Sequence, residues 1–448
     1  MKHVWTVLLF LLCGADAAFA QTAPLRITLD EAIARGMEAS HRLEEFGARH
    51  DAARAIEGQR EAAERPQLAA IASYTRTNHV EEFSVPNASG DVRVIYPDIP
   101  DNVRSRIDLQ WPIYTGGRLH ALTRAAGAEA DAAGHDRDAA RADLKLEITR
   151  AFWAVMTARA SLDVVEQALE RTSAHLNDVR NQLGVGLVPP SDVLTIEAQH
   201  ARQRMLGIEA ENLVETTSAE LKRLVGLDPE VSVELVADLS GAARETPAGF
   251  GEGGKVGTLK AVITEARESR PERKSLLFRI TAAEERVAAA TAASLPVLSA
   301  IAGYDLSRPN PRIFPIQERW KPSWDIGVNV RWALFDGGRV RAETAEAAAN
   351  RRATEARLRD FDAIIDVEIR QRMADLRSAS ASIEAAEAGA RAAMEARRVI
   401  AERFSAGVAT NTDVLNAQTV LLQAELDVTR ARANAELAGA RLDRALGR

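Results

Sequence analysis

The sequence predicts a mainly α-helical chain that carries four β-strands and consists of two copies of one unit. The phrase W-P-I-Y-T-G-G-R at residues 111–118 returns as W-A-L-F-D-G-G-R at 332–339. Each copy opens a stretch rich in Ala, Glu and Arg that contains no proline, at 117–182 and 338–403. Before each phrase, apolar and polar residues alternate with the period of a β-strand. These three observations carry the prediction.

Further matches extend the repeat over most of the chain. P-Q-L-A-A-I-A-S-Y at 66–74 corresponds to P-V-L-S-A-I-A-G-Y at 296–304, and residues 184–194 correspond to 405–415. Matching segments in order at a nearly constant offset indicate a duplicated unit, here 21–246 and 258–448. The first copy is longer between residues 74 and 111, and because insertions collect in loops, we expect a loop there.

Each unit begins with a helical stretch. In the first copy it covers residues 28–64, with Thr28 as N-cap and Glu31 completing a capping box. The counterpart covers 258–294 and is interrupted at Pro271, which lacks the main-chain N–H that a continuous helix needs.

The two proline-free stretches predict very long helices, 117–182 and 338–403. At 1.5 Å per residue each makes a rod of roughly 100 Å. Glycine-containing turns at 183–191 and 404–412 follow, and return helices come next. We expect Ser191 and Thr412 to be the hydroxyl N-caps of those return helices.

The alternating segments predict two β-hairpins, at 66–114 and 296–335. In the first, Ile107, Leu109 and Trp111 alternate with Asp108 and Gln110. Strands with one apolar face, one wet face and aromatic ends are typical of outer-membrane proteins. We expect interfacial aromatic side chains at Trp111, Tyr114, Trp332 and Phe335. The strand-to-helix junctions are predicted at Gly116, Gly117, Gly337 and Gly338, where glycine permits a sharp change of backbone conformation.

Four strands cannot close a barrel, and an open sheet edge in lipid leaves main-chain polar groups unsatisfied. The chain is therefore expected to oligomerise. A dimer would give eight strands, whose interior is filled by side chains, whereas a trimer would give twelve and leave room for a channel.

The N-terminus predicts export. Lys2 and His3 precede an apolar run, and Ala18-Phe19-Ala20 gives a cleavage site, so residues 1–20 read as a signal peptide. Cys13 is the only cysteine, and because the preceding Leu12 is not small, lipidation is not favoured. No later apolar run approaches the length of a transmembrane helix. The net charge of −7 offers no basic face for nucleic acid.

The sequence does not favour three other classes of protein. An enzyme is not favoured, because the histidines are scattered and paired carboxylates such as Glu44-Glu45 are ordinary helix-surface charges. The G-x-G-x-x-G in the Gly-rich linker at 247–257 follows no strand, so a dinucleotide site is not expected. A periplasmic coiled-coil scaffold without a pore explains the rods and the export but not the lipid-type strands. A trimeric adhesin does not explain antiparallel helix pairs repeated twice.

The chain resembles the TolC family of outer-membrane efflux proteins over essentially all of its mature length. L-D-E-A-I at 29–33, the two Gly-Gly-Arg phrases and the two turns ending in [ST]-D-V-L carry the resemblance. It implies a two-repeat α-helical barrel across the periplasm, continued by a 12-stranded β-barrel in the outer membrane of a homotrimer. No metal or cofactor is implied.

The resemblance also implies partners. Family members receive substrate from an inner-membrane pump of RND, ABC or MFS type through a periplasmic membrane-fusion (adaptor) protein, which docks at the helix tips. The corresponding tips here are Val185, Gly186, Leu187, Ala406, Gly407 and Val408. The residues before the second tip, Arg397, Arg398, Glu402 and Arg403, form a more basic set than the acidic ring known in the best-described member of the family, so gate residues do not carry over.

Overall fold

The computed structural model describes residues 25–87, 90–237 and 256–448. The predicted signal peptide and most of the linker at 247–257 lie outside these ranges. The described residues fall into two compact units, and both repeats contribute to each. We call residues 25–39, 148–237 and 389–433 the helical unit, and residues 40–147, 256–388 and 434–448 the sheet unit.

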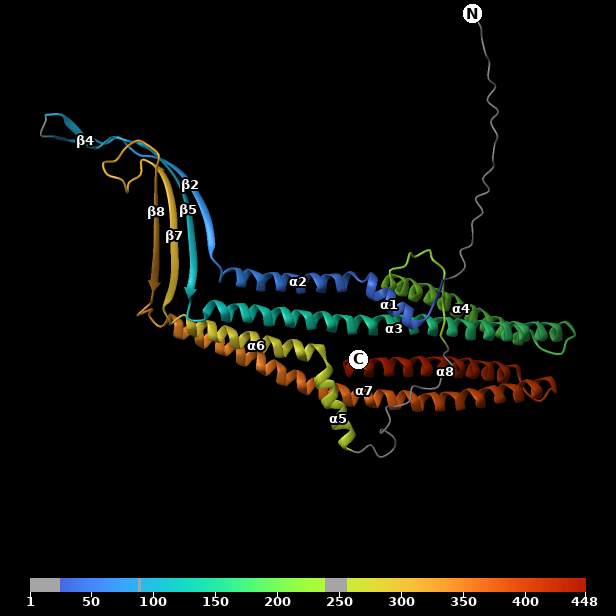
Figure 1. The fold of residues 1–448 in the computed structure, drawn as a ribbon. Coiled ribbons are helices and arrows are strands. Elements are labelled where there is room, and N and C mark those ends of the chain that lie inside the picture. Colours follow the sequence, from blue (N-terminus) through green and yellow to red (C-terminus); the bar gives the residue numbers. More distant parts are fainter. Residues whose placement is uncertain (1–24, 88–89, 238–255) are drawn as a thin grey trace, which may run out of the picture. The chain divides into compact units, whose positions relative to one another are not determined.

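A four-stranded antiparallel sheet dominates the sheet unit (Figure 1). Its order is β2 (Gln67–Arg76), β5 (Asp101–Tyr114), β7 (Val297–Arg308) and β8 (Lys321–Arg331). β5 pairs with β2 on one side and with β7 on the other, so the strands of the two repeats form one sheet. β2 and β8 are the edges of this sheet, and each has a strand partner on one side only.

The connection between β2 and β5 contains a small hairpin of β3 (Phe83–Pro86) and β4 (Val92–Tyr96). The corresponding connection between β7 and β8 is a shorter loop, residues 309–320. The length difference between the repeats therefore lies between strands, as expected. The segment is not wholly a loop, because the hairpin occupies part of it.

The helices of the sheet unit are α2 (His41–Ala62), α5 (Val256–Ser269), α6 (Pro271–Ala292), the first parts of α3 (Arg118–Gly184) and α7 (Arg339–Ser405), and the end of α8 (Asn411–Ala445). α5 and α6 separate at Arg270, and Pro271 occupies the first turn of α6, where a missing N–H costs nothing. The core of this unit joins α5, α7 and the end of α8, with Ile365, Ile369 and Leu442 almost fully buried.

The helical unit contains α1 (Leu29–Ala39), α4 (Pro190–Val225), the second parts of α3 and α7, and most of α8 (Asn411–Ala445). β1 (Leu25–Ile27) and β6 (Val233–Leu235) add a short parallel pair. Its core joins α3 to α4 and α8 through Leu176, Val179, Val193, Ile196 and Leu415.

The first predicted helix is correct at its start but is not continuous. The Thr28 N–H donates to Glu31 Oε2 (2.9 Å) and the Glu31 N–H donates to Thr28 Oγ1 (3.3 Å), which is the expected capping box. The helix breaks at Ser40, which has extended backbone and accepts a hydrogen bond from the Leu43 N–H as the N-cap of α2. A serine that satisfies a free N–H favours a new helix start over continuation.

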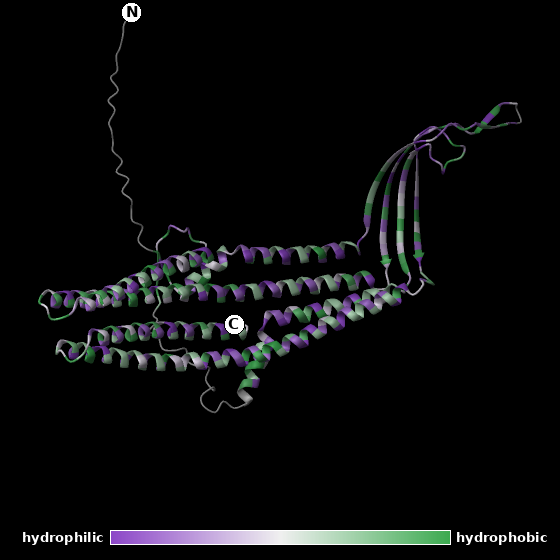
Figure 2. Cartoon of the chain, turned by 180° about the vertical axis from the view of Figure 1, so that it is seen from behind, coloured by the Kyte–Doolittle hydropathy of each residue, from purple (hydrophilic) through white to green (hydrophobic). Residues whose placement is uncertain are grey.

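Hydrophobic and hydrophilic residues are interspersed along the long helices (Figure 2). Among the helices in the described ranges, none is both long enough and apolar enough to cross a membrane.

Gly226 and Gly186 allow a matched test of helix ends. Both have positive φ, +68° and +77°, but a Cβ on Gly226 would lie 2.4 Å from Ala39 Cβ, whereas a Cβ on Gly186 would meet open space. Gly186→Ala is expected to cost about 1–2 kcal/mol for the left-handed backbone alone. Gly226→Ala should cost more and lower the melting temperature measured by circular dichroism further. Equal losses would contradict the contact between α1 and the end of α4.

Candidate functional surfaces

One face of the four-stranded sheet is apolar and exposed. The pleat and register place Ile107, Tyr304 and Trp324 in one row across three strands, and Leu109, Ala302 and Ile326 in the next. Trp324 is 71% exposed and Ile326 is 76% exposed. The exposed members of this face are Leu68, Tyr74, Ile107, Trp111, Tyr304, Leu306, Trp324, Ile326, Val328 and Val330. An apolar surface of this extent marks a contact with lipid or with another protein.

The opposite face of the sheet is charged. Arg106 on β5 holds two carboxylates: its Nε lies 2.6 Å from Asp108 Oδ1, and its Nη1 and Nη2 donate to both oxygens of Asp325 on β8 (2.9 and 3.0 Å). Arg104 pairs with Asp305 beside this group. Bidentate arginine–carboxylate pairs are among the strong hydrogen-bonded contacts in proteins. This face therefore carries charged groups that water can solvate, and its ion pairs link β5 to β8 across β7.

Gly303 on β7 makes that link possible. Its opposite neighbours are Asp108 on one side and Asp325 on the other, and the Arg106 guanidinium crosses between them directly above it. A Cβ on Gly303 would lie 2.1 Å from Arg106 Nη2. The polar alternation in the sequence predicts a wet face but does not predict this network. An isolated glycine inside a strand was the signal that could have found it.

The two strand-to-helix junctions are built alike. Gly116, Gly117, Gly337 and Gly338 all have positive φ, between +64° and +88°. The residue before each glycine pair caps the following helix: Thr115 Oγ1 accepts from the Leu119 N–H (3.4 Å), and Asp336 accepts from the Val340 N–H (2.9 Å). The backbone therefore changes from strand to helix around these glycines.

The predicted interfacial aromatics lie near these junctions. Trp111 and Tyr114 are among the last four residues of β5, whereas Trp332 and Phe335 follow the last residue of β8. The Trp332 Nε1–H donates to the Ser294 carbonyl (3.1 Å), and Phe335 is 91% exposed. Their role at a membrane interface stays a prediction.

The two tips have the same main-chain geometry. At the first, the Leu187 N–H donates to Gln182 O and the Gly186 N–H donates to Leu183 O, both at 2.9 Å. At the second, Val408 and Gly407 make the corresponding bonds to Arg403 and Phe404. This is the Schellman pattern, which needs positive φ at the glycine. Beside the glycines, Val185 and Leu187 are 72% and 76% exposed, and Ala406 and Val408 are also exposed.

The predicted N-caps of the return helices are wrong. α4 begins at Pro190, with Pro189 as a cap that makes no side-chain hydrogen bond, so Ser191 is already inside the helix. α8 begins at Asn411, and Thr410 is its cap: the Asp413 N–H donates to Thr410 Oγ1 (3.2 Å), and Asp413 accepts from the Thr410 N–H (2.9 Å). Bonds from the Thr410 hydroxyl and N–H hold the pKa of Asp413 below its ordinary value.

Behind the tips, polar side chains join α3 to α8. His175 Nε2 lies 2.7 Å from Asn411 Oδ1, and Thr172 donates to Gln418 Oε1 (3.0 Å), all in buried surroundings. Arg171, next to Thr172 on α3, pairs with Glu425 (2.9 Å), about two turns beyond Gln418 on α8. Within the described ranges, His, Cys, Asp and Glu side chains form no group of three that could hold a metal ion.

A sequence model of the outer membrane efflux protein family matches residues 33–227 and 262–448. The chain therefore belongs to the outer membrane efflux protein family, whose members are channels of the outer membrane.

Among individual proteins, the chain is 28% identical to Protein CyaE of Bordetella pertussis over 328 residues, which covers 72% of this chain and 67% of that protein. It is 23% identical to outer membrane protein TolC of Vibrio cholerae over 308 residues, 68% of this chain and 67% of that one. The crystal structure of the outer membrane protein VceC of Vibrio cholerae has the same fold, with a TM-score of 0.76 at 21% identity, covering 94% of this chain and 96% of that chain.

Gly303 and Gly327 give a matched pair for the charged face. Both lie on that face, but a Cβ on Gly327 meets nothing closer than 3.6 Å. Gly303→Ala should displace Arg106 from Asp325 and lower the melting temperature of the protein in detergent, whereas Gly327→Ala should leave it unchanged or raise it. In an Arg106→Ala background the cost of Gly303→Ala should vanish. An unchanged cost in that background would contradict the clash.

Proposed function

We propose that this chain forms a homotrimeric channel through which solutes leave the periplasm across the outer membrane. The observation that carries the proposal is the sheet with one exposed apolar face and one charged face. In the proposed assembly, the apolar face contacts outer-membrane lipid and the charged face lines water. The proposal gives the chain the role of a conduit and assigns it no catalysis.

The edge strands support assembly from several copies. β2 and β8 have partners on one side only, and unpaired main-chain groups cost several kcal/mol each in hydrocarbon. Because all neighbours in the sheet are antiparallel, β2 and β8 run in opposite directions. The β8 edge of one copy can therefore pair antiparallel with the β2 edge of the next. Three copies give the twelve strands that leave room for a channel.

The helices support the same assembly. Leu415 on α8 is 8% exposed because it lies in the core cluster with residues of α3 and α4, whereas Leu194, which holds the equivalent position on α4 of the first repeat, is 64% exposed. By the repeat, the counterpart of α3 is α7. We infer that α4 of one copy packs against α7 of its neighbour, as α8 packs against α3 within the chain. A periplasmic scaffold without a pore would leave the apolar sheet face uncovered and is not favoured.

The exposed side chains at the tips suggest which partners the channel has. The exposed aliphatic side chains Val185, Leu187 and Val408 offer an apolar docking surface on helices otherwise covered with charge. We assign this surface to a periplasmic adaptor that connects the channel to an inner-membrane pump. RND, ABC and MFS pumps all remain compatible with it. The proposed domain organisation is that of two repeats, 21–246 and 258–448, joined by the linker at 247–257.

The trimer can be tested by disulfide cross-linking, because the predicted mature chain contains no cysteine. One cysteine at Ala70 or Ala72 on β2 is combined with one at Ile326 or Val328 on β8. In outer-membrane fractions, at least one combination should give covalent trimers on non-reducing gels. The control Ile107→Cys/Tyr304→Cys places both cysteines opposite each other within one chain and should migrate as a monomer. Covalent species that stop at dimers would overturn the proposal.

The docking surface has a separate test. Val185→Glu and Val408→Glu should abolish export while trimer yield and heat stability remain normal, because both side chains are exposed. Efflux is measured as drug accumulation in cells that rely on this channel. Arg398→Gln, away from the turn, is the control. Full export by both tip variants would contradict docking there.

A further inference from the structure

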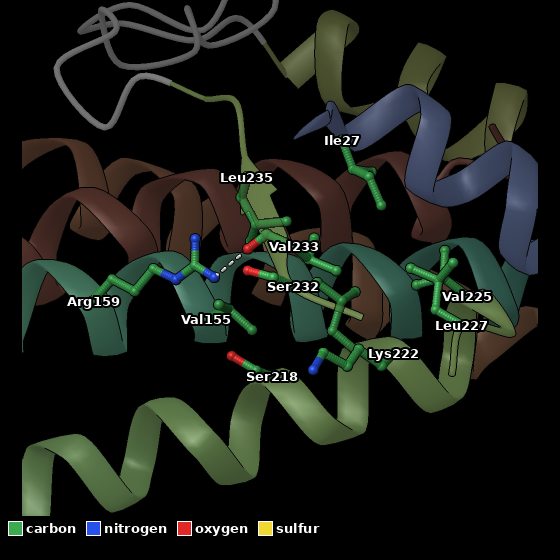
Figure 3. Close-up of a pocket in the computed structure, with 11 residues that line it drawn as sticks. Ile27, Val155, Arg159, Ser218, Lys222, Val225, Leu227, Ser232, Val233 and Leu235 are labelled. Atoms are coloured by element: carbon green, nitrogen blue, oxygen red, sulfur yellow. Dashed lines mark hydrogen bonds between the residues drawn. The ribbon is translucent and has the colours of Figure 1, made fainter. Parts of the chain in front are cut away.

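A cavity of about 150 Å³ lies in the helical unit, where α3 and α4 meet the β1–β6 pair (Figure 3). Seven aliphatic side chains and four polar ones line it. The polar four are Arg159 from α3, Ser218 and Lys222 from α4, and Ser232, which precedes β6. Figure 3 shows these four side chains around the cavity, with Val155 among them and Arg159 directed at the Val233 carbonyl.

The charge in this cavity is one-sided. Arg159 Nη2 donates to the Val233 carbonyl (2.7 Å) and Lys222 Nζ donates to the Pro229 carbonyl (2.6 Å), and both acceptors are neutral. Among the residues that the structure describes, no Asp or Glu lines the cavity.

The nearby carboxylate of Glu234 does not line the cavity, although its charge also acts on Arg159. It projects from β6 between the inward-facing Val233 and Leu235, and it is held by Arg26 through two hydrogen bonds of 3.0 and 3.1 Å. Two cations therefore face an apolar cavity without a counter-charge among its described walls.

The second repeat shows which lining residues the fold itself requires. At an offset of 221 residues, Val155, Leu221 and Val225 correspond to Leu376, Leu442 and Leu446, which lie in the buried core against Ile263. The aliphatic wall is thus common to both repeats. Arg159 and Lys222 correspond instead to Ser380 and Asp443. The same helix packing forms without either cation, so helix packing does not explain them.

We propose that this cavity binds a small organic carboxylate with a compact apolar body. The carboxylate accepts from Arg159, Lys222 and the two serine hydroxyls, and the apolar body lies against Val155, Leu221 and Val225. A cavity of this size in a protein core accommodates a molecule of about the volume of benzene. Charge-assisted bonds from arginine and lysine select the anion over a neutral molecule of the same shape.

The test uses sodium benzoate as the probe and the purified mature protein in detergent. Isothermal titration calorimetry at constant ionic strength should show saturable binding of benzoate, and benzoate should raise the melting temperature by mass action. Benzamide, which has the same shape without the charge, should bind at least about tenfold more weakly. Arg159→Gln and Lys222→Gln should each weaken benzoate binding by about tenfold or more, since each removes a hydrogen bond to a charged group.

Lys260→Gln is the charge-matched control, because Lys260 is an exposed residue of α5 and does not line the cavity. It should leave benzoate binding unchanged. Lys222→Gln decides the matter if Arg159→Gln, which also loses its bond to Val233, disturbs the fold. The proposal is overturned if benzoate does not saturate, if benzamide binds equally well, or if Lys222→Gln binds benzoate as the natural chain does. None of these readouts depends on trimer formation or export.

Discussion

The main-chain hydrogen bonds at the edges of the four-stranded sheet constrain everything else in this molecule. β5 and β7 have strand partners on both sides, but β2 and β8 each carry a row of N–H and C=O groups with no strand beside them. Water could satisfy those groups, yet the exposed Trp324, Ile326 and Val328 give this sheet a face suited to hydrocarbon. In the trimer that we propose, the sheet of a neighbouring copy satisfies these edges, because lipid offers no hydrogen bonds. The contacts between copies would then complete the sheet of each chain.

The conversion from strand to helix explains why the chain repeats one phrase. β5 leads into α3 and β8 leads into α7 within a few residues, at Thr115-Gly116-Gly117 and Asp336-Gly337-Gly338. Glycine allows the positive φ, and the preceding Thr or Asp caps the first free N–H groups of the new helix. Both strand-to-helix junctions follow the second strand of a hairpin. The strands that lead into the two long helices therefore run in the same direction.

Strong, repeated signals made most of the fold predictable from the sequence. The long helices were predicted from proline-free stretches, the strands from alternation, and the tips from paired glycine turns. Short or local features were missed. β1 and β6 have three residues each and pair across more than 200 positions, which leaves no periodicity to detect. The break at Ser40 and the cap at Thr410 depend on single side-chain bonds that compete with equally plausible alternatives. The Arg106 network required the register between three strands.

The two tips, although equivalent in the repeat, begin their return helices by different means. Pro190 fixes the start of α4 through its ring, which no change of solvent can alter. The start of α8 relies on the ionised carboxylate of Asp413, whose pKa in the folded chain is lowered by Thr410. Such a group stabilises the fold above the unfolded pKa of about 3.9, and its contribution is lost as the pH falls through the folded value. Acid therefore loosens the second turn before the first, and the two halves of a nearly symmetric protein respond unequally to the same proton concentration.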